Sequence, residues 1–265
     1  MDGMHSACRA TDTVAATSWG LRLRCGAVAG AAGGLASVVV LWLMVEPVIG
    51  RAILLEEEMH GRHEAGGAHE HGATVTRLQQ QIGGTITVLV VGVLLGLAFA
   101  VIYARVQHRF SEETDLGRAL SLAALAFTVV AAVPSVMVPA NPPGIGSSDT
   151  VGRRTLIYLL IILVGVLFVG VVFALHRAAV DRGIAPEGRW LLTAAAVAIG
   201  ALVVFSVPHV EERVPSVIPA DLVWDFRVGS LVQTAALWTT MGIVHGVLLH
   251  RERERESVSL MARGR

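Results

Sequence analysis

The chain has 265 residues, of which 54% are hydrophobic and only 16% are charged, and its formal net charge is zero. A soluble domain carries closer to a quarter charged residues, so a chain this apolar is expected to lie in lipid. A chain with no net charge lacks the basic surface that a nucleic-acid-binding protein uses to contact phosphates. The sequence also contains no lysine, which excludes a P-loop ATPase and a pyridoxal enzyme because both need a lysine amine.

Six apolar segments are long enough to cross a bilayer, which takes about 20 residues of helix. In chain order they are residues 25–45, 82–104, 119–139, 155–175, 190–208 and 229–250. We therefore predict an all-α fold, a polytopic membrane helix bundle with about six transmembrane helices. Its membrane domain covers residues 25–250, between an N-terminal tail at 1–24 and a C-terminal tail at 251–265.

The arginines predict the orientation. An even number of spans places both tails on one side of the membrane, together with the loops at 105–118 and 176–189. These four segments hold 14 of the 21 arginines. Since cytoplasmic loops are the arginine-rich ones, both termini are expected in the cytoplasm, and the chain is expected in the cytoplasmic membrane.

The first span carries small residues at four-residue spacing, at Gly26, Gly30 and Gly34, and the second repeats the spacing at Gly92 and Gly96. Glycines at this spacing let two helix backbones approach closely, so these faces are interpreted as packing surfaces.

The first span is expected to end at Glu46 and Pro47, and residues 46–81 then form an outer loop. Within this loop, a stretch of twelve residues holds four of the ten histidines of the chain. Imidazole and carboxylate together suit divalent ions such as Co, Ni, Cu and Zn, so the loop is a candidate for metal capture; the alternative is a solvated polar linker. The candidate ligands in this loop are Glu46, Glu56, Glu57, Glu58, His60, His63, His69 and His71.

Two other polar regions are candidates for an ion pathway. His209 and Glu211 follow the fifth span on the outer side, which is net negative and should attract cations. In the sixth span, Met241 and His245 continue a polar stripe that begins at Ser230. Ionisable residues inside a membrane usually face the bundle interior, so this stripe lines either a pathway or a packing face.

Pro134, in the third span, is expected to kink its helix and to free a backbone carbonyl, because proline has no N–H to donate. A stiff segment with two prolines, residues 141–144, follows that span.

Several short motifs, in order, resemble the CbtA family of predicted cobalt transporter subunits. They are Trp42-Leu43-Met44-Val45-Glu46-Pro47, Asn141-Pro142-Pro143-Gly144, Pro208-His209, Val217-Ile218-Pro219-Ala220-Asp221-Leu222, and the final helix with Trp238 and Gly242. The resemblance covers most of the chain. It implies cobalt uptake for cobalamin synthesis and a small one-helix partner, CbtB, that carries its own histidine motif.

The preferred hypothesis is transport of a divalent metal ion, cobalt or else nickel or zinc, with no permanently bound cofactor. The outer histidines and glutamates would gather the ion, Glu46, His209 and Glu211 would receive it, and Met241 and His245 would line its path. The alternative is a non-transporting membrane scaffold or metal sensor that docks a partner. No enzyme motif is found, and expected partners are lipid, the CbtB-type subunit and further copies of the chain.

Overall fold

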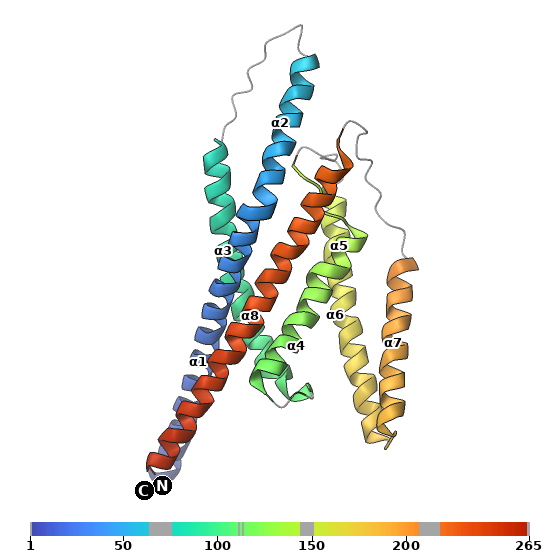
Figure 1. Ribbon diagram of the computed structural model, residues 1–265. Helices are drawn as coiled ribbons and strands as arrows, with labels where there is room; N and C mark the ends of the chain where they lie inside the picture. The colour runs from blue at the N-terminus through green and yellow to red at the C-terminus, as the bar shows by residue number, and fades with distance from the viewer. Residues whose placement is uncertain are drawn as a thin grey trace. The chain divides into compact units, whose positions relative to one another are not determined.

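The computed structural model describes residues 2–63, 76–110, 112, 114–143, 151–206 and 218–263. All regular elements within these ranges are helices, and six of the described helices are long and apolar enough to cross a membrane (Figure 1). They are Trp19–Glu58, Arg77–Arg109, Asp115–Met137, Val151–Asp181, Pro186–Val204 and Ala220–Arg255. The predicted all-α class and the six spans are confirmed.

The helical elements have the following bounds. They are α1 (Asp2–Val40), η1 (Leu41–Val45), α2 (Glu46–His63), α3 (Arg77–Val106), η2 (Gln107–Arg109), α4 (Asp115–Phe127), η3 (Thr128–Ala132), α5 (Val133–Met137), α6 (Val151–Asp181), α7 (Pro186–Ser206) and α8 (Ala220–Arg263). The C-terminal helix therefore continues well beyond the expected end of its span at residue 250.

The expectation that the first helix ends at Glu46 and Pro47 is wrong. The helix runs on through α2 to His63, so the first part of the expected loop is helical, and its last residues belong to α3. The five-residue π turn η1 stands directly before Glu46. A π turn widens the backbone locally, which accommodates a proline ring that would otherwise clash with the preceding turn.

The same arrangement recurs before the second helical proline. The π turn η3 precedes α5, in which Pro134 is the second residue. Val130 stands four residues before Pro134, and its carbonyl oxygen accepts a hydrogen bond from the Tyr158 hydroxyl at 2.8 Å. The predicted freed carbonyl is therefore present, and Tyr158 of α6 satisfies it.

The chain divides into two compact units. Unit 1 comprises Met1–Pro47, Met59–Ala126 and Val232–Arg265, and unit 2 comprises Val48–Glu58 and Phe127–Leu231. Unit 1 thus contains α1, α3, most of α4 and the C-terminal part of α8. Unit 2 contains α5, α6, α7 and the start of α8.

Unit 1 is held together by contacts between small residues. A Cβ added at Gly92 of α3 would lie 2.8 Å from the carbonyl oxygen of Gly30 and 2.9 Å from the Cα of Gly34, both on α1. One added at Gly33 would lie 2.7 Å from the carbonyl oxygen of Leu237 on α8. The helix backbones therefore touch, and the interpretation of these glycines as packing surfaces is confirmed.

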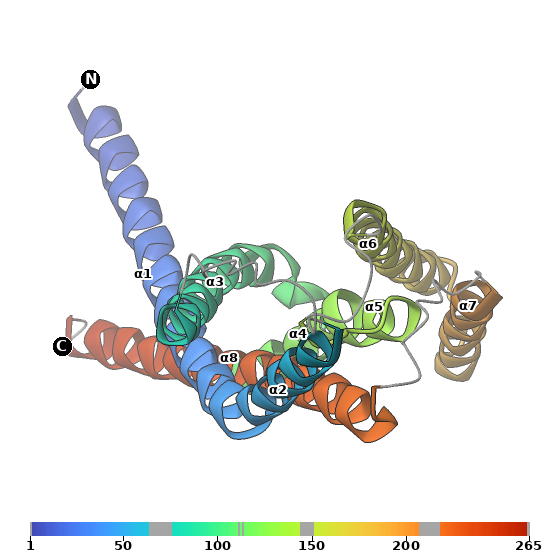
Figure 2. The same ribbon diagram turned by 90° about the horizontal axis from the view of Figure 1, so that it is seen from above.

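Unit 2 contains a helical hairpin, in which α6 and α7 lie side by side (Figures 1 and 2). Gly183 follows the end of α6 with a φ of 70°, and the backbone N–H of Ile184 donates to the carbonyl of Ala179 at 3.0 Å. A glycine in the left-handed region with this backbone bond closes a helix, and Pro186 then starts α7 at the position where proline is best tolerated. The hairpin turn is thus set by local sequence.

Candidate functional site

His245 lies in the interior of unit 1, on the inward face of α8. It is 1% exposed, and Met241, one turn earlier, is 0% exposed. The two share a face because residues four apart are neighbours on a helix. The prediction that this part of the polar stripe points into the protein is confirmed, while a role in an ion pathway stays a prediction.

Aromatic rings surround the His245 imidazole. Phe99 and Tyr103 of α3 both meet it edge-on, with ring centroids 5.2 and 5.1 Å away. The backbone of Cys25 on α1 is its hydrogen-bonding neighbour, and Nδ1 is buried without a hydrogen-bond partner in the part of the chain that the structure describes. Buried polar atoms are rarely left unpaired, so Nδ1 offers an unused position for a ligand or a proton.

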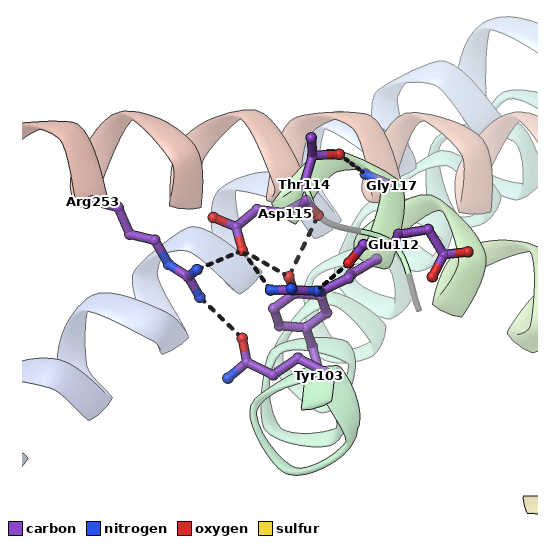
Figure 3. A network of polar contacts seen from close by, with 8 residues as sticks. Tyr103, Glu112, Thr114, Asp115, Gly117 and Arg253 are labelled. Carbon is purple, nitrogen blue, oxygen red and sulfur yellow. Dashed lines mark hydrogen bonds and ion pairs between the residues drawn. The ribbon is translucent and has the colours of Figure 1, made fainter. Parts of the chain in front are cut away.

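A second group of polar residues contacts the hydroxyl of Tyr103. The Tyr103 hydroxyl donates to the carboxylate of Asp115 at 3.3 Å, and Arg253 of α8 pairs with the same carboxylate oxygen at 3.0 Å (Figure 3). Arg118 approaches that oxygen at 3.8 Å. The Asp115 side chain is 4% exposed, so these two guanidinium groups supply the counter-charge that a buried carboxylate requires.

This Asp115 network joins three helices at one end of unit 1. Asp115 begins α4, Tyr103 is in the last turn of α3, and Arg253 is near the end of α8, where it also donates to Gln107 at 3.1 Å. Tyr103 belongs both to this network and to the aromatic surroundings of His245. Tyr103 therefore stands between the buried imidazole and the charged residues at this end of the unit.

The carboxylate of Glu46 forms a third polar group in unit 1, between the first helix and α3. It makes an ion pair with Arg77 through Oε2, and Gln81 donates to the same oxygen at 3.1 Å. One turn further along α3, Thr85 accepts a hydrogen bond from the Trp42 indole at 3.2 Å. Glu46 was predicted as a metal ligand; in this structure its charge is compensated by an arginine.

The structure describes the side chains of only some of the other predicted ligands. Glu56 is half-buried on α2, and Glu57 and Glu58 are exposed there. His60 and His63 lie on α2, but their side chains fall outside the described part of the chain, as do His69, His71, His209 and Glu211 entirely. Among the residues that are described, no three His, Cys, Asp or Glu side chains form a group that could hold a metal ion.

Sequence reasoning missed the partners of both carboxylates and of His245. Cys25 opens an apolar run and reads as an ordinary core residue, and it is 5% exposed. Asp115 and Arg253 are separated by more than a hundred residues, so no local pattern links them. The one available signal was Tyr103, which is one of only two tyrosines and stands on the face of α3 that carries Gly92 and Gly96.

Comparison with known proteins supplies the family. Residues 22–250 match the model of the CbtA family, which is described as a probable cobalt transporter subunit. No curated protein and no solved structure matches the chain.

Proposed function

Because the chain belongs to the CbtA family of probable cobalt transporter subunits, we propose that it carries Co²⁺ into the cell across the cytoplasmic membrane. The chain is a multi-pass membrane protein with six candidate spans. A dication crossing such a membrane inward gains about 4.6 kcal/mol per 100 mV of membrane potential, twice the value for a single charge. The potential alone can therefore drive uptake.

The observation that carries the proposed route is the buried imidazole of His245. Its Nδ1 is buried without a hydrogen-bond partner among the described residues, and an unpaired polar atom in an apolar interior costs free energy, which supports a functional role for this imidazole. Imidazole nitrogen is a good ligand for Co²⁺, and the Met241 thioether offers a softer ligand one turn away. We assign His245 and Met241 to the path of the ion through unit 1.

The histidines at the end of α2 and in the segment after it would act before this point. Residues 60–71 include the last turn of α2 and the residues that follow it, and they carry four imidazoles. A tethered group of this kind raises the local concentration of metal without forming a barrier. We propose that His60, His63, His69 and His71 capture Co²⁺ outside the cell, and that His209 and Glu211 assist.

The orientation in this proposal places both termini in the cytoplasm. The guanidinium groups of Arg22 and Arg105 lie over the ring of Trp19, 5.6 and 5.8 Å from its centroid. Tryptophan and arginine together are typical of the membrane–water interface, with arginine enriched on the cytoplasmic side. An impermeant thiol reagent should label Ala68→Cys in intact cells; labelling only after lysis would reverse the orientation.

A subunit implies partners. We propose that the partner is a small one-helix protein of the CbtB type that carries its own histidines. The alternative function, a membrane scaffold or metal sensor that does not transport, would keep metal binding between α2 and α3 and use the buried residues only for packing.

The test is Co²⁺ accumulation in cells that express the parent chain, His245→Ala or His245→Gln, normalised to the amount of inserted protein. Gln keeps a hydrogen-bonding group but lacks the imidazole nitrogen proposed to bind Co²⁺, so it should insert normally and still lose maximal flux. Flux like that of the parent in the Gln variant would remove His245 from the route. No accumulation with the parent and its partner would favour the scaffold.

A further inference from the structure

Glu46 lies where a bare carboxylate is unfavourable. Its side chain is 12% exposed, and both described contacts of the carboxylate, from Arg77 and Gln81, fall on Oε2. Oε1 has no partner among the residues that the structure describes. The carboxylate is therefore largely buried, and a cation beside it is favoured because a buried charge without a counter-charge is destabilising. Either a guanidinium group or a metal ion can supply this positive charge.

Arg77 is the resident cation, and its location makes it replaceable. It is the first residue of α3, where the positive end of the helix dipole disfavours a cation, and its side chain is 37% exposed. The start of α3 does not depend on it, because Thr76 and Gln79 cap this helix with reciprocal hydrogen bonds of 2.8 and 3.3 Å. Arg77 can therefore leave the carboxylate without unwinding the helix that carries it.

The groups that remain when Arg77 leaves suit a divalent metal ion. The Glu46 carboxylate supplies two oxygens, and Gln81 of the next turn of α3, whose amide nitrogen now donates to Oε2, supplies its amide oxygen once the amide group turns over. Carboxylate and carbonyl oxygens bind divalent cations, and a dication compensates the charge of Glu46 at least as well as a guanidinium does. The histidine-bearing segment that precedes α3 ends only a few residues before Arg77.

We infer that Glu46 is a cation-exchange site, at which a divalent metal ion displaces the tethered guanidinium of Arg77. Arg77 then acts as a built-in competitor: it keeps the carboxylate neutralised while no metal is present and is released when metal arrives. The inference rests on the proposed function only for the identity of the ion as Co²⁺.

The experiment follows the release of Arg77 in the parent protein, purified and reconstituted in lipid nanodiscs. An arginine-specific dicarbonyl reagent is applied with and without Co²⁺, and the modification of each arginine is read by mass spectrometry. Co²⁺ should raise the modification rate of Arg77 several-fold. Arg51 is the matched control, because it pairs with Asp225 at 2.8 Å and is 49% exposed, and its rate should stay constant.

Two variants separate exchange from a static ion pair. In Glu46→Gln, Arg77 should react quickly from the start, and Co²⁺ should add nothing. In Arg77→Gln, the half-saturating Co²⁺ concentration for binding should fall, because the competitor is gone. An Arg77 rate in the parent that is unchanged or lowered by Co²⁺ would overturn the inference, as would an equal rise at Arg51.

Failure of the exchange and failure of transport give different results. The modification rate of Arg77 is measured on purified protein and needs no flux across a membrane. Cells without cobalt accumulation, combined with Co²⁺-dependent release of Arg77, would reject transport and retain the exchange. Normal cobalt accumulation with no release of Arg77 would reject the exchange and retain transport.

Discussion

The contact between α1 and α3 predicts that replacing glycine by alanine lowers stability at one position of α3 and raises it at another. In Gly92→Ala the new Cβ would lie 2.8 Å from the Gly30 carbonyl oxygen, whereas ordinary Cβ contacts start at about 3.4 Å. The obstacle is backbone, which cannot rotate away, so the helices must separate by about 0.6 Å. Overpacking of this kind costs about 1–3 kcal/mol.

Gly84→Ala is the control. A Cβ at Gly84 meets no atom within 4 Å. Replacing glycine by alanine inside a helix stabilises it by about 0.5–1 kcal/mol, because glycine loses more backbone freedom on folding. The two variants should therefore differ by about 1.5–4 kcal/mol, with the parent between them.

Cys25 provides the assay. It is 5% exposed and stands next to Gly26 on the packed face of α1, so a thiol-reactive dye reaches it only when unit 1 opens. Unfolding is followed by heating the detergent-solubilised protein with the dye in a Cys8→Ser background, which leaves a single thiol. Equal unfolding midpoints for Gly92→Ala and Gly84→Ala would refute the close contact.

Three further predictions follow from other contacts. Tyr158→Phe removes the hydroxyl that satisfies the Val130 carbonyl and should lower stability by about 0.5–1.5 kcal/mol; because both residues lie in unit 2, thermal unfolding is followed by the loss of helical circular dichroism instead of at Cys25, and an unchanged midpoint would mean that another group takes over. Arg253→Gln leaves the buried Asp115 carboxylate with Arg118 alone, at 3.8 Å, and should cost about 3 kcal/mol, the lower end for breaking a buried ion pair; Asp115→Asn should cost less, because it removes the buried charge and leaves Arg253, which is 53% exposed, in solvent, and the reverse ranking would contradict the network. Alanine at all four loop histidines should raise the half-saturating Co²⁺ concentration for uptake and leave maximal flux unchanged, whereas unchanged uptake at limiting Co²⁺ would favour a solvated linker. Those histidines are His60, His63, His69 and His71.

The features predictable from sequence are those that depend on near neighbours along the chain. Hydropathy marks the spans, glycine spacing marks the packed face of α1, and the missing N–H of Pro134 marks a carbonyl in need of a partner. The inward direction of Met241 and His245 also follows from helical periodicity alone.

The features that escaped prediction depend on partners distant in sequence or on a local exception to helix geometry. The π turn before Pro47 carries the helix past a residue that normally ends one, and nothing in the composition of Leu41–Val45 distinguishes it from an ordinary helical turn. Glu46 was interpreted as a free ligand because its partner, Arg77, stands 31 residues away. A burial pattern indicates that a carboxylate is enclosed, but only the tertiary structure shows which arginine compensates its charge.

The backbone contact between α1 and α3 also closes the space between these two helices to ions. Where the carbonyl of Gly30 touches Gly92, there is no room for water, and a hydrated ion cannot pass between these two helices. The path proposed for the ion through unit 1 would therefore lie on another face of α3 or along α8, where the imidazole of His245 is found.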